Sequence, residues 1–220
     1  MSEAANATSA ALPAGPPVAP RLALYWAPPP THPLWRSGCD WLGRDPAGTD
    51  LGAPPAHARA PWRYGFHATL KAPMHPRHGA DEAAFIDAVA AFSARWHDFE
   101  MPPLRVAWLR GFMALRPTHA LCAVHPLRRL ADACVTEFDP WRAHAAHAPP
   151  WGYAHVFERW RFHMTLSDDT PNDRTRLEAR ASAHFAPSLA VPLRAQGLAV
   201  FREDQPGAPL RLLGRFDFAR

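Results

Sequence analysis

The chain has 220 residues, 48% of them hydrophobic, which is enough to build a sizeable core. Its formal net charge is only +4 and its arginines are spread along the sequence, so the composition argues against a long nucleic acid as partner and favours a small anionic one. No apolar run reaches the length of a membrane-spanning helix, and the three cysteines are scattered without a CxxC pair. We therefore expect a cytoplasmic monomer with reduced thiols and no membrane partner.

Residues 1–20 are rich in Ala, Pro and Ser and almost free of charge, which predicts a disordered tail, and they lack the basic start of a signal peptide. Residues 21–220 are expected to form a single domain. The elements predicted there are, in chain order, a strand at Leu22–Trp26, a short helix at Leu34–Leu42 inside an irregular connection, a strand around His67, a helix capped by Asp81, strands at Leu104–Leu109, Phe112–Leu115 and Ala120–Val124, a helix starting at Pro126, a strand around His163, a helix opened by Asn172 or Asp173, and a hairpin of Leu189–Arg202 with Leu210–Phe218.

A short pattern occurs twice in the chain. Phe66-His67-Ala68-Thr69-Leu70 returns as Phe162-His163-Met164-Thr165-Leu166, with Arg63 and Arg159 at equivalent places upstream. Thr between aromatic and apolar residues indicates strands, along which side chains alternate between the two faces. Each copy therefore presents a histidine and a threonine together. A repeated strand among mixed elements predicts an α+β fold: two pseudo-symmetric lobes of antiparallel sheet plus helices around a central cleft, with one His-x-Thr strand per lobe.

Two histidines and two threonines that face one cleft are suited to acid–base chemistry on a phosphate ester. Imidazole titrates near neutrality, so His67 and His163 are candidates for a general base and general acid pair. The hydroxyls of Thr69 and Thr165 can donate to the non-bridging phosphate oxygens and stabilise their charge.

Further candidates come from neighbouring positions on the predicted strands. Two residues beyond each threonine, alternation places Lys71 and Ser167 on the histidine face. Lys71 is the only lysine of the chain, and we weigh a phosphate contact against an ordinary surface lysine at a strand end. Tyr25 on the first strand, Tyr153 and Arg161 are candidates to line the cleft and contact the substrate.

The paired motifs resemble the two-histidine (2H) phosphoesterase superfamily, whose members act on cyclic phosphates and related phosphodiesters without a metal. Longer strings are similar to a bacterial branch associated with phosphonate-degradation operons. They are Pro33-Leu34-Trp35, Trp41-Leu42-Gly43-Arg44-Asp45, Tyr64-Gly65 through Ala72-Pro73, and Trp151-Gly152-Tyr153 through Phe162-His163-Met164-Thr165-Leu166. The resemblance covers most of residues 21–220, and Ser167-Asp168-Asp169 departs from it slightly. It implies a bilobal fold, catalytic His67 and His163, and phosphate-binding Thr69 and Thr165.

The expected function is that of a metal-independent phosphodiesterase that opens a small cyclic phosphate without a cofactor. The branch resemblance points to a ribosyl 1,2-cyclic phosphate in phosphonate catabolism. Three alternatives stay open. The first is a phosphodiesterase for RNA ends or 2′,3′-cyclic nucleotides, and the second is a non-catalytic module that binds a nucleotide or sugar phosphate. The third is a zinc enzyme using His75-x-x-His78 or His144-x-x-His147, which lack nearby Cys or paired acids.

Overall fold

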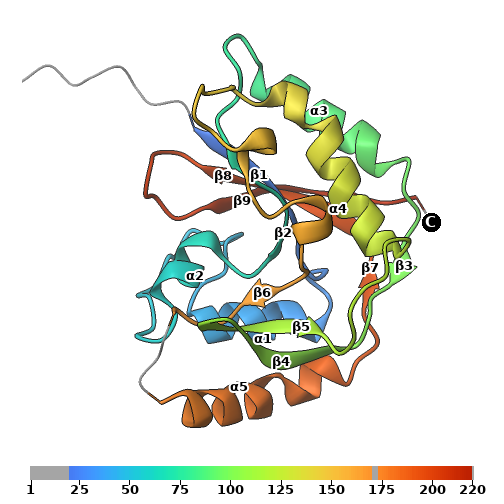
Figure 1. The fold of residues 1–220 in the computed structure, drawn as a ribbon. Helices are drawn as coiled ribbons and strands as arrows, with labels where there is room; N and C mark the ends of the chain where they lie inside the picture. The colour runs from blue at the N-terminus through green and yellow to red at the C-terminus, as the bar shows by residue number, and fades with distance from the viewer. Residues whose placement is uncertain (1–19, 170–172, 220) are drawn as a thin grey trace, which may run out of the picture.

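The computed structural model describes residues 20–169 and 173–219. Their main feature is a seven-stranded antiparallel sheet (Figure 1). Its strands pair in the order β4-β5-β6-β2-β1-β8-β9, and a small second sheet pairs β3 with β7. The strands are β1 Arg21–Trp26, β2 Ala68–Met74, β3 Phe99–Glu100, β4 Leu104–Leu109, β5 Phe112–Pro117, β6 Met164–Thr165, β7 Arg194–Ala195, β8 Gly197–Glu203 and β9 Arg211–Asp217. The predicted α+β class with antiparallel sheet is therefore confirmed.

The helices begin largely where the sequence predicts. They are α1 Pro33–Leu42, α2 Arg59–Tyr64, α3 Glu82–Ser93, α4 Pro126–Glu137 and α5 Arg174–Leu189, with short 3-10 turns at Asp139–Trp141, Pro150–Gly152 and Phe157–Arg159. Asp81 caps α3 by accepting a hydrogen bond from the backbone N–H of Ala83, and Pro126 is the first residue of α4. Asp173 caps α5, whereas Asn172 and all but the last residue of the predicted 1–20 tail lie outside the described residues.

Three local predictions need correction. The strand predicted at Ala120–Val124 is absent, because this mostly exposed segment pairs with no strand and instead turns into α4. The first arm of the C-terminal hairpin starts at Gly197, since Leu189 still belongs to α5. Helix α2 lies in a stretch predicted to be irregular.

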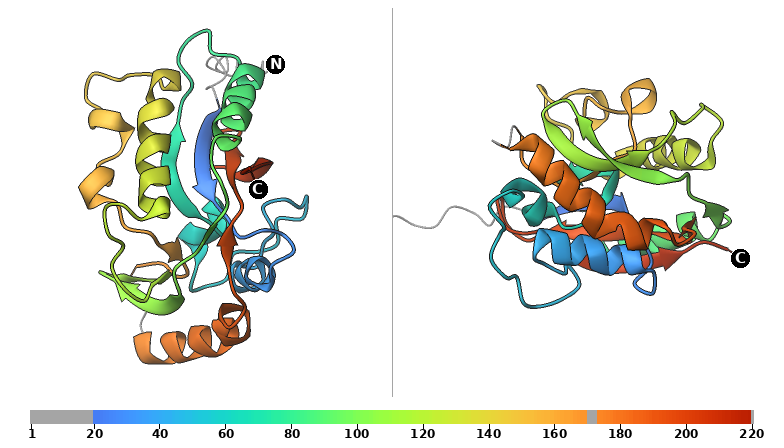
Figure 2. Two further views of the ribbon diagram at one scale, coloured as in Figure 1. Left: turned by 90° about the vertical axis from the view of Figure 1, so that its right-hand side faces the viewer. Right: turned by 90° about the horizontal axis from the view of Figure 1, so that it is seen from below.

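The two lobes expected from the repeat are the two halves of one sheet. β2 and β6, which follow the two histidines, are neighbours at the centre. One half, β2-β1-β8-β9, carries α3 and α4, and the other half, β4-β5-β6, carries α5 with α1 beside it (Figure 2). The lobes therefore meet along a pair of strands and share a continuous backbone ladder there.

Helices α3, α4 and α5 pack on the same face of the sheet, and α1 packs beside α5. The contacts that place them are Lys71 to Val135 of α4, Arg202 to Glu82 of α3, Trp108 to Glu178 of α5, and Phe66 to both Phe185 of α5 and Gly38 of α1. Tyr25 and Thr69 form a pair on the opposite face. Neither α3, α4 nor α5 packs on that face, and it is the face on which the site is built. Within the described part of the chain, no helix is both long and apolar enough to cross a membrane.

Gly38, in the middle of α1, gives room to the ring of Phe66, the residue before His67. A Cβ at position 38 would lie 2.0 Å from Phe66 Cδ1. Although alanine is the better helix former by about 0.5–1 kcal/mol, we expect Gly38→Ala to destabilise the fold by about 1–3 kcal/mol through overpacking. Urea unfolding would measure this. Gly48→Ala is the control, because its nearest neighbour is Asp45 O at 3.4 Å, and equal stability of the two variants would contradict the packing described.

Candidate active site

The two His-x-Thr motifs meet at one residue pair in the middle of the sheet. Ala68 of β2 pairs with Met164 of β6 in antiparallel register. One step along this ladder, His67 faces Thr165 on the neighbouring strand. Because side chains alternate along a strand, the pair itself is buried on the helix side while His67 and Thr165 point to the other face.

The same Ala68–Met164 pair also brings the other threonine and the other histidine together. One step the other way, Thr69 of the first motif faces His163 of the second. Each histidine thus lies beside the threonine of the other copy, and an approximate twofold axis passes through the central pair. The structure therefore brings together the four residues that the sequence singles out, on one face of one sheet.

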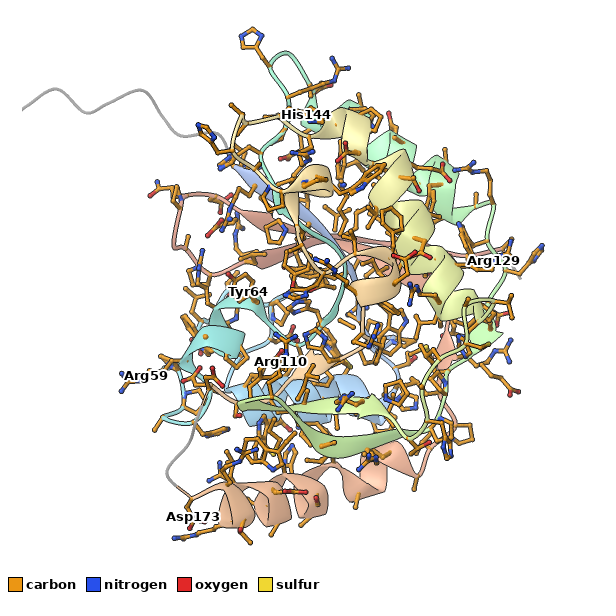
Figure 3. The ribbon with its side chains drawn as sticks, viewed as in Figure 1. Arg59, Tyr64, Arg110, Arg129, His144 and Asp173 are labelled. Carbon is orange, nitrogen blue, oxygen red and sulfur yellow. The ribbon has the colours of Figure 1, made fainter. Side chains whose placement is uncertain are left out.

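A cavity of about 180 Å³ opens on this face. Thr69 and His163 lie on its sheet side, next to the apolar side chains of Leu109 and Phe112. The other lining residues come from the β4–β5 turn and from the segment before β6, and they are Arg110, Tyr153, His155, Arg159, Trp160 and Arg161. Arg110 is labelled in Figure 3 at the turn between β4 and β5. The cavity is smaller than the roughly 300–1,000 Å³ of sites for drug-sized ligands.

Both imidazoles are held in the same way by the backbone. His67 Nδ1 donates to the carbonyl of Gly65 at 2.8 Å, and His163 Nδ1 donates to the carbonyl of Arg161 at 2.7 Å. A carbonyl can only accept, so the proton of each neutral ring lies on Nδ1 and the lone pair on Nε2. In the first motif Nε2 lies 3.3 Å from Thr69 Oγ1. Nε2 is thus the nitrogen of each ring that the backbone does not hold, and in His67 it is hydrogen-bonded to the Thr69 hydroxyl.

His67 is held neutral by its surroundings. Burial is the main cause and lowers its pKa to about 4, while the Gly65 carbonyl acts in the opposite direction. The ring of Tyr25 contributes to the burial by stacking on the imidazole, with centroids 3.7 Å apart. Positive charge on His163 or on Arg44 lowers the pKa further, which shows that the two histidines lie close enough to interact.

His163 is shifted in the same direction. Burial lowers its pKa most, the carbonyl of Arg161 raises it, and the charges of Arg116 and His155 lower it. Its ring also contacts Phe112, with centroids 5.6 Å apart. Both imidazoles are therefore neutral near pH 7, and an anion bound between them would favour protonation of either one.

Helix α2 positions His67 and is tied to the second motif. Asp168, two residues beyond the second motif, accepts hydrogen bonds from the first backbone N–H groups of α2, those of Arg59 at 2.9 Å and Ala60 at 2.7 Å. The helix ends at Tyr64, and the carbonyl of the next residue, Gly65, holds His67. Arg59 and Tyr64, labelled in Figure 3, mark the two ends of α2. Sequence reasoning missed this helix because its cap lies more than a hundred positions away in the chain.

A buried carboxylate supports the other end of α2. Glu203 forms ion pairs with Arg21 and Arg63 and accepts a hydrogen bond from the N–H of Gly207. The backbone carbonyl of Arg63 also accepts from Leu210 N. Arg63, one of the residues that extends the repeat, is thus a structural anchor of α2 to the β8–β9 hairpin.

Lys71 is a correction to the sequence analysis. An irregularity in the β1–β2 register sets Thr69 opposite Tyr25 but Lys71 opposite Leu24, so Lys71 turns to the helix-covered face. There it is 3% exposed, donates to the Val135 carbonyl at 3.1 Å and pairs with Asp139 at 3.4 Å in a cluster with Arg142. It does not line the cavity beside Thr69 and His163.

The remaining candidates divide into cavity residues and structural ones. Tyr153 and Arg161 line the cavity, and Tyr25 stacks on the ring of His67. Ser167 is buried, and its Oγ accepts from Met113 N and donates to the Asp168 carbonyl, so it serves the β5–β6 junction and does not face a ligand.

The histidines of the zinc alternative lie apart from this cavity. His75, His78, His144 and His147 are all exposed. Within residues 20–169 and 173–219, no three side chains of His, Cys, Asp or Glu gather as ligands for a metal ion.

Comparison with known proteins gives a family match over most of the chain. A family model described as "Protein of unknown function (DUF1045)" matches residues 69–150 and 144–211. Two curated relatives are both called ribose 1,5-bisphosphate phosphokinase PhnN. That of Laribacter hongkongensis is 38% identical over 215 residues, an alignment of 87% of this chain and 50% of the relative. That of Janthinobacterium sp. is 33% identical over 236 residues, covering 90% of this chain and 51% of the relative.

The chain therefore spans about half the length of the curated relatives it matches. Among solved structures, the crystal structure of E. coli LigT complexed with 3′-AMP aligns over 91% of this chain and 99% of LigT. Its sequence identity is 14% and its TM-score 0.47, a likeness too distant to carry an argument about this site.

The lowered pKa of His67 predicts a pH-dependent stability. The pKa of His67 is 6.5 in the unfolded chain and about 4 in the folded one, so between pH 6.5 and pH 4 the unfolded chain binds a proton at His67 that the folded chain does not bind. The free energy of unfolding should therefore fall as the pH falls through this window, by up to roughly 3 kcal/mol from this group. Urea unfolding at several pH values would show the loss in wild type and a smaller loss in His67→Gln. His147→Gln, at an exposed histidine, is the control, and equal losses in all three proteins would contradict the burial of His67.

Proposed function

The chain belongs to the DUF1045 family of proteins of unknown function, and we propose that it is a metal-independent phosphodiesterase of the two-histidine type. It opens a small cyclic phosphate by general acid–base catalysis between His67 and His163. One imidazole takes a proton from the attacking water, and the other protonates the departing oxygen. Which ring has which role depends on the ester bond that faces it.

The observation that carries the proposal is the matched pair of imidazoles. His67 and His163 each direct Nε2 away from the backbone on the same face, because each donates Nδ1–H to the carbonyl two residues earlier. In-line displacement at phosphorus needs one proton-transfer group on the side of the attacking oxygen and another on the side of the leaving oxygen. Two rings related by an approximate twofold axis supply that arrangement.

The threonines complete the phosphate site. Thr69 and Thr165 lie beside the histidines of opposite motifs, so their hydroxyls flank a phosphate held between the rings. They would donate to its two non-bridging oxygens. A bound phosphodiester anion also raises the pKa of the adjacent imidazoles, which permits one of them to act as the acid near neutral pH.

The size of the cavity and the relatives support a small sugar phosphate. A cavity of about 180 Å³ fits a ribosyl ring with its cyclic phosphate better than a polynucleotide. The curated relatives, about twice as long as this chain, are named for ribose 1,5-bisphosphate. We propose a ribosyl 1,2-cyclic phosphate of phosphonate catabolism as the substrate. We also propose that the protein acts as a cytoplasmic monomer without a cofactor, a membrane or a long nucleic acid.

Phosphorus NMR of a substrate panel tests this function. The panel contains a ribosyl 1,2-cyclic phosphate and 2′,3′-cyclic nucleotides, incubated with EDTA-treated wild type, His67→Ala and His163→Ala. We expect wild type to open a cyclic phosphate and each variant to lose about a hundred- to ten-thousand-fold in rate. His147→Ala, at an exposed histidine of the zinc alternative, is the control and should keep wild-type activity.

Three outcomes would contradict the proposal. Activity abolished by EDTA would indicate a metal enzyme. Tight binding of a panel member without turnover would indicate a binding module. Retention of activity by either histidine variant would remove that histidine from the reaction.

A further inference from the structure

A second cavity adjoins the first and is strongly basic. It measures about 540 Å³ and shares Trp160 and Arg161 with the cavity beside Thr69 and His163. Its charged and titratable lining residues are Arg105, Arg116, His119, Arg128, Glu158 and Arg161. The proposed reaction at phosphorus uses none of these side chains.

The register of the sheet places two of these arginines in a row with His163. β5 pairs with β6 at Ala114 and Thr165, so two residues further along the same ladder Arg116 comes opposite His163. Arg105 of β4 pairs directly with Arg116. Since paired residues share a face, both arginines stand on the histidine face. The charge of Arg116 acts on His163, whose pKa it lowers.

These guanidinium groups lack counter-charges. Among residues 20–169 and 173–219, none of the ion pairs involves Arg105, Arg116 or Arg161. Arg116 donates through Nη1 to the Trp108 carbonyl at 3.1 Å, and its buried Nε has no partner.

The other two charged residues of this cavity differ. Arg128 is paired with Asp132 at 3.3 Å, and Glu158 adds one negative charge to the lining. The guanidinium of arginine stays charged at any relevant pH and matches phosphate in geometry. Three uncompensated guanidinium groups around one cavity therefore favour an anionic ligand.

We propose that this basic cavity binds a second phosphate group of the substrate, on the His163 side of the reacting phosphorus. The inference rests on the proposed function and adds a substrate class to it: cyclic phosphates that carry another phosphate elsewhere on the molecule. The second group is a terminal phosphate on the same sugar or the bridging phosphate of a neighbouring nucleotide. Both present the same anionic oxygens to Arg105, Arg116 and Arg161.

The test compares kcat/KM for three substrates that share one cyclic phosphate. These are adenosine 2′,3′-cyclic phosphate, its 5′-phosphorylated form, and a dinucleotide ending in the same cyclic phosphate. We expect wild type to prefer at least one of the two substrates with a second phosphate over the first by tenfold or more. Arg116→Gln should reduce that ratio by about ten- to a hundredfold, as the loss of one charged hydrogen bond predicts.

Two further variants make the result specific. Arg105→Gln, at an exposed position that carries little risk to folding, should reduce the ratio in the same direction. Arg129→Gln removes the same charge from an exposed arginine of α4 that lies outside both cavities (Figure 3), and it should keep the wild-type ratio. Whichever of the two substrates with a second phosphate is preferred identifies the source of that phosphate.

The failure of this proposal can be told from the failure of the proposed function. Turnover of all three substrates with equal kcat/KM, or ratios unchanged in Arg105→Gln and Arg116→Gln, would overturn the second phosphate site alone. If no substrate turns over, calorimetry would compare the binding affinities of adenosine 3′,5′-bisphosphate and adenosine 3′-monophosphate, which tests the second phosphate site without catalysis. Tighter binding of the bisphosphate that depends on Arg116 would support the site, and equal binding would overturn it.

Discussion

The site depends on one antiparallel residue pair, Ala68 with Met164. Two strands that carry the same motif and run in opposite directions can bring both histidines to one face only if they pair close to the motif centre. A shift by one residue would send one histidine to the helix side. The small Ala68 and the unbranched Met164 are fully buried beneath the helices, so their packing fixes the register on which His67 and His163 depend.

The surrounding structure converts this register into a defined protonation state. Asp168, which follows the second motif, holds the start of α2, and the end of α2 presents the carbonyl that orients His67 in the first motif. A structural change in one half of the sheet therefore alters the position of the histidine in the other half. Tyr25 stacks on the same ring and excludes water from it. The result is a neutral imidazole with a fixed tautomer before any ligand binds.

Much of this arrangement could be predicted from the sequence, because its cause is local. Alternation along short strands is enough to group His67 with Thr69, and helix starts at Asp81 and Pro126 follow from capping chemistry. Alternation fails at Lys71, because a register irregularity turns this side chain to the other face. No residue type in that stretch predicts the irregularity.

The contacts that sequence reasoning missed are formed across long chain separations. The cap of α2 by Asp168 and the anchoring of Arg63 by Glu203 depend on how distant strands are paired. Arg105 and Arg116 of the basic cavity stand on β4 and β5, and only the strand order places them beside the second histidine. Such residues carry no local pattern, so they become visible only when the fold is known.

The most direct test of the account is nitrogen-15 NMR of the histidine rings, titrated with adenosine 3′-monophosphate. Signals would be assigned with His67→Asn and His163→Asn. The account predicts that both free rings are neutral near pH 7 with the proton on Nδ1, and that both Nε2 signals shift with one common dissociation constant. Rings protonated on Nε2, or a ligand that shifts only one of the two histidines, would contradict a single site built from both motifs.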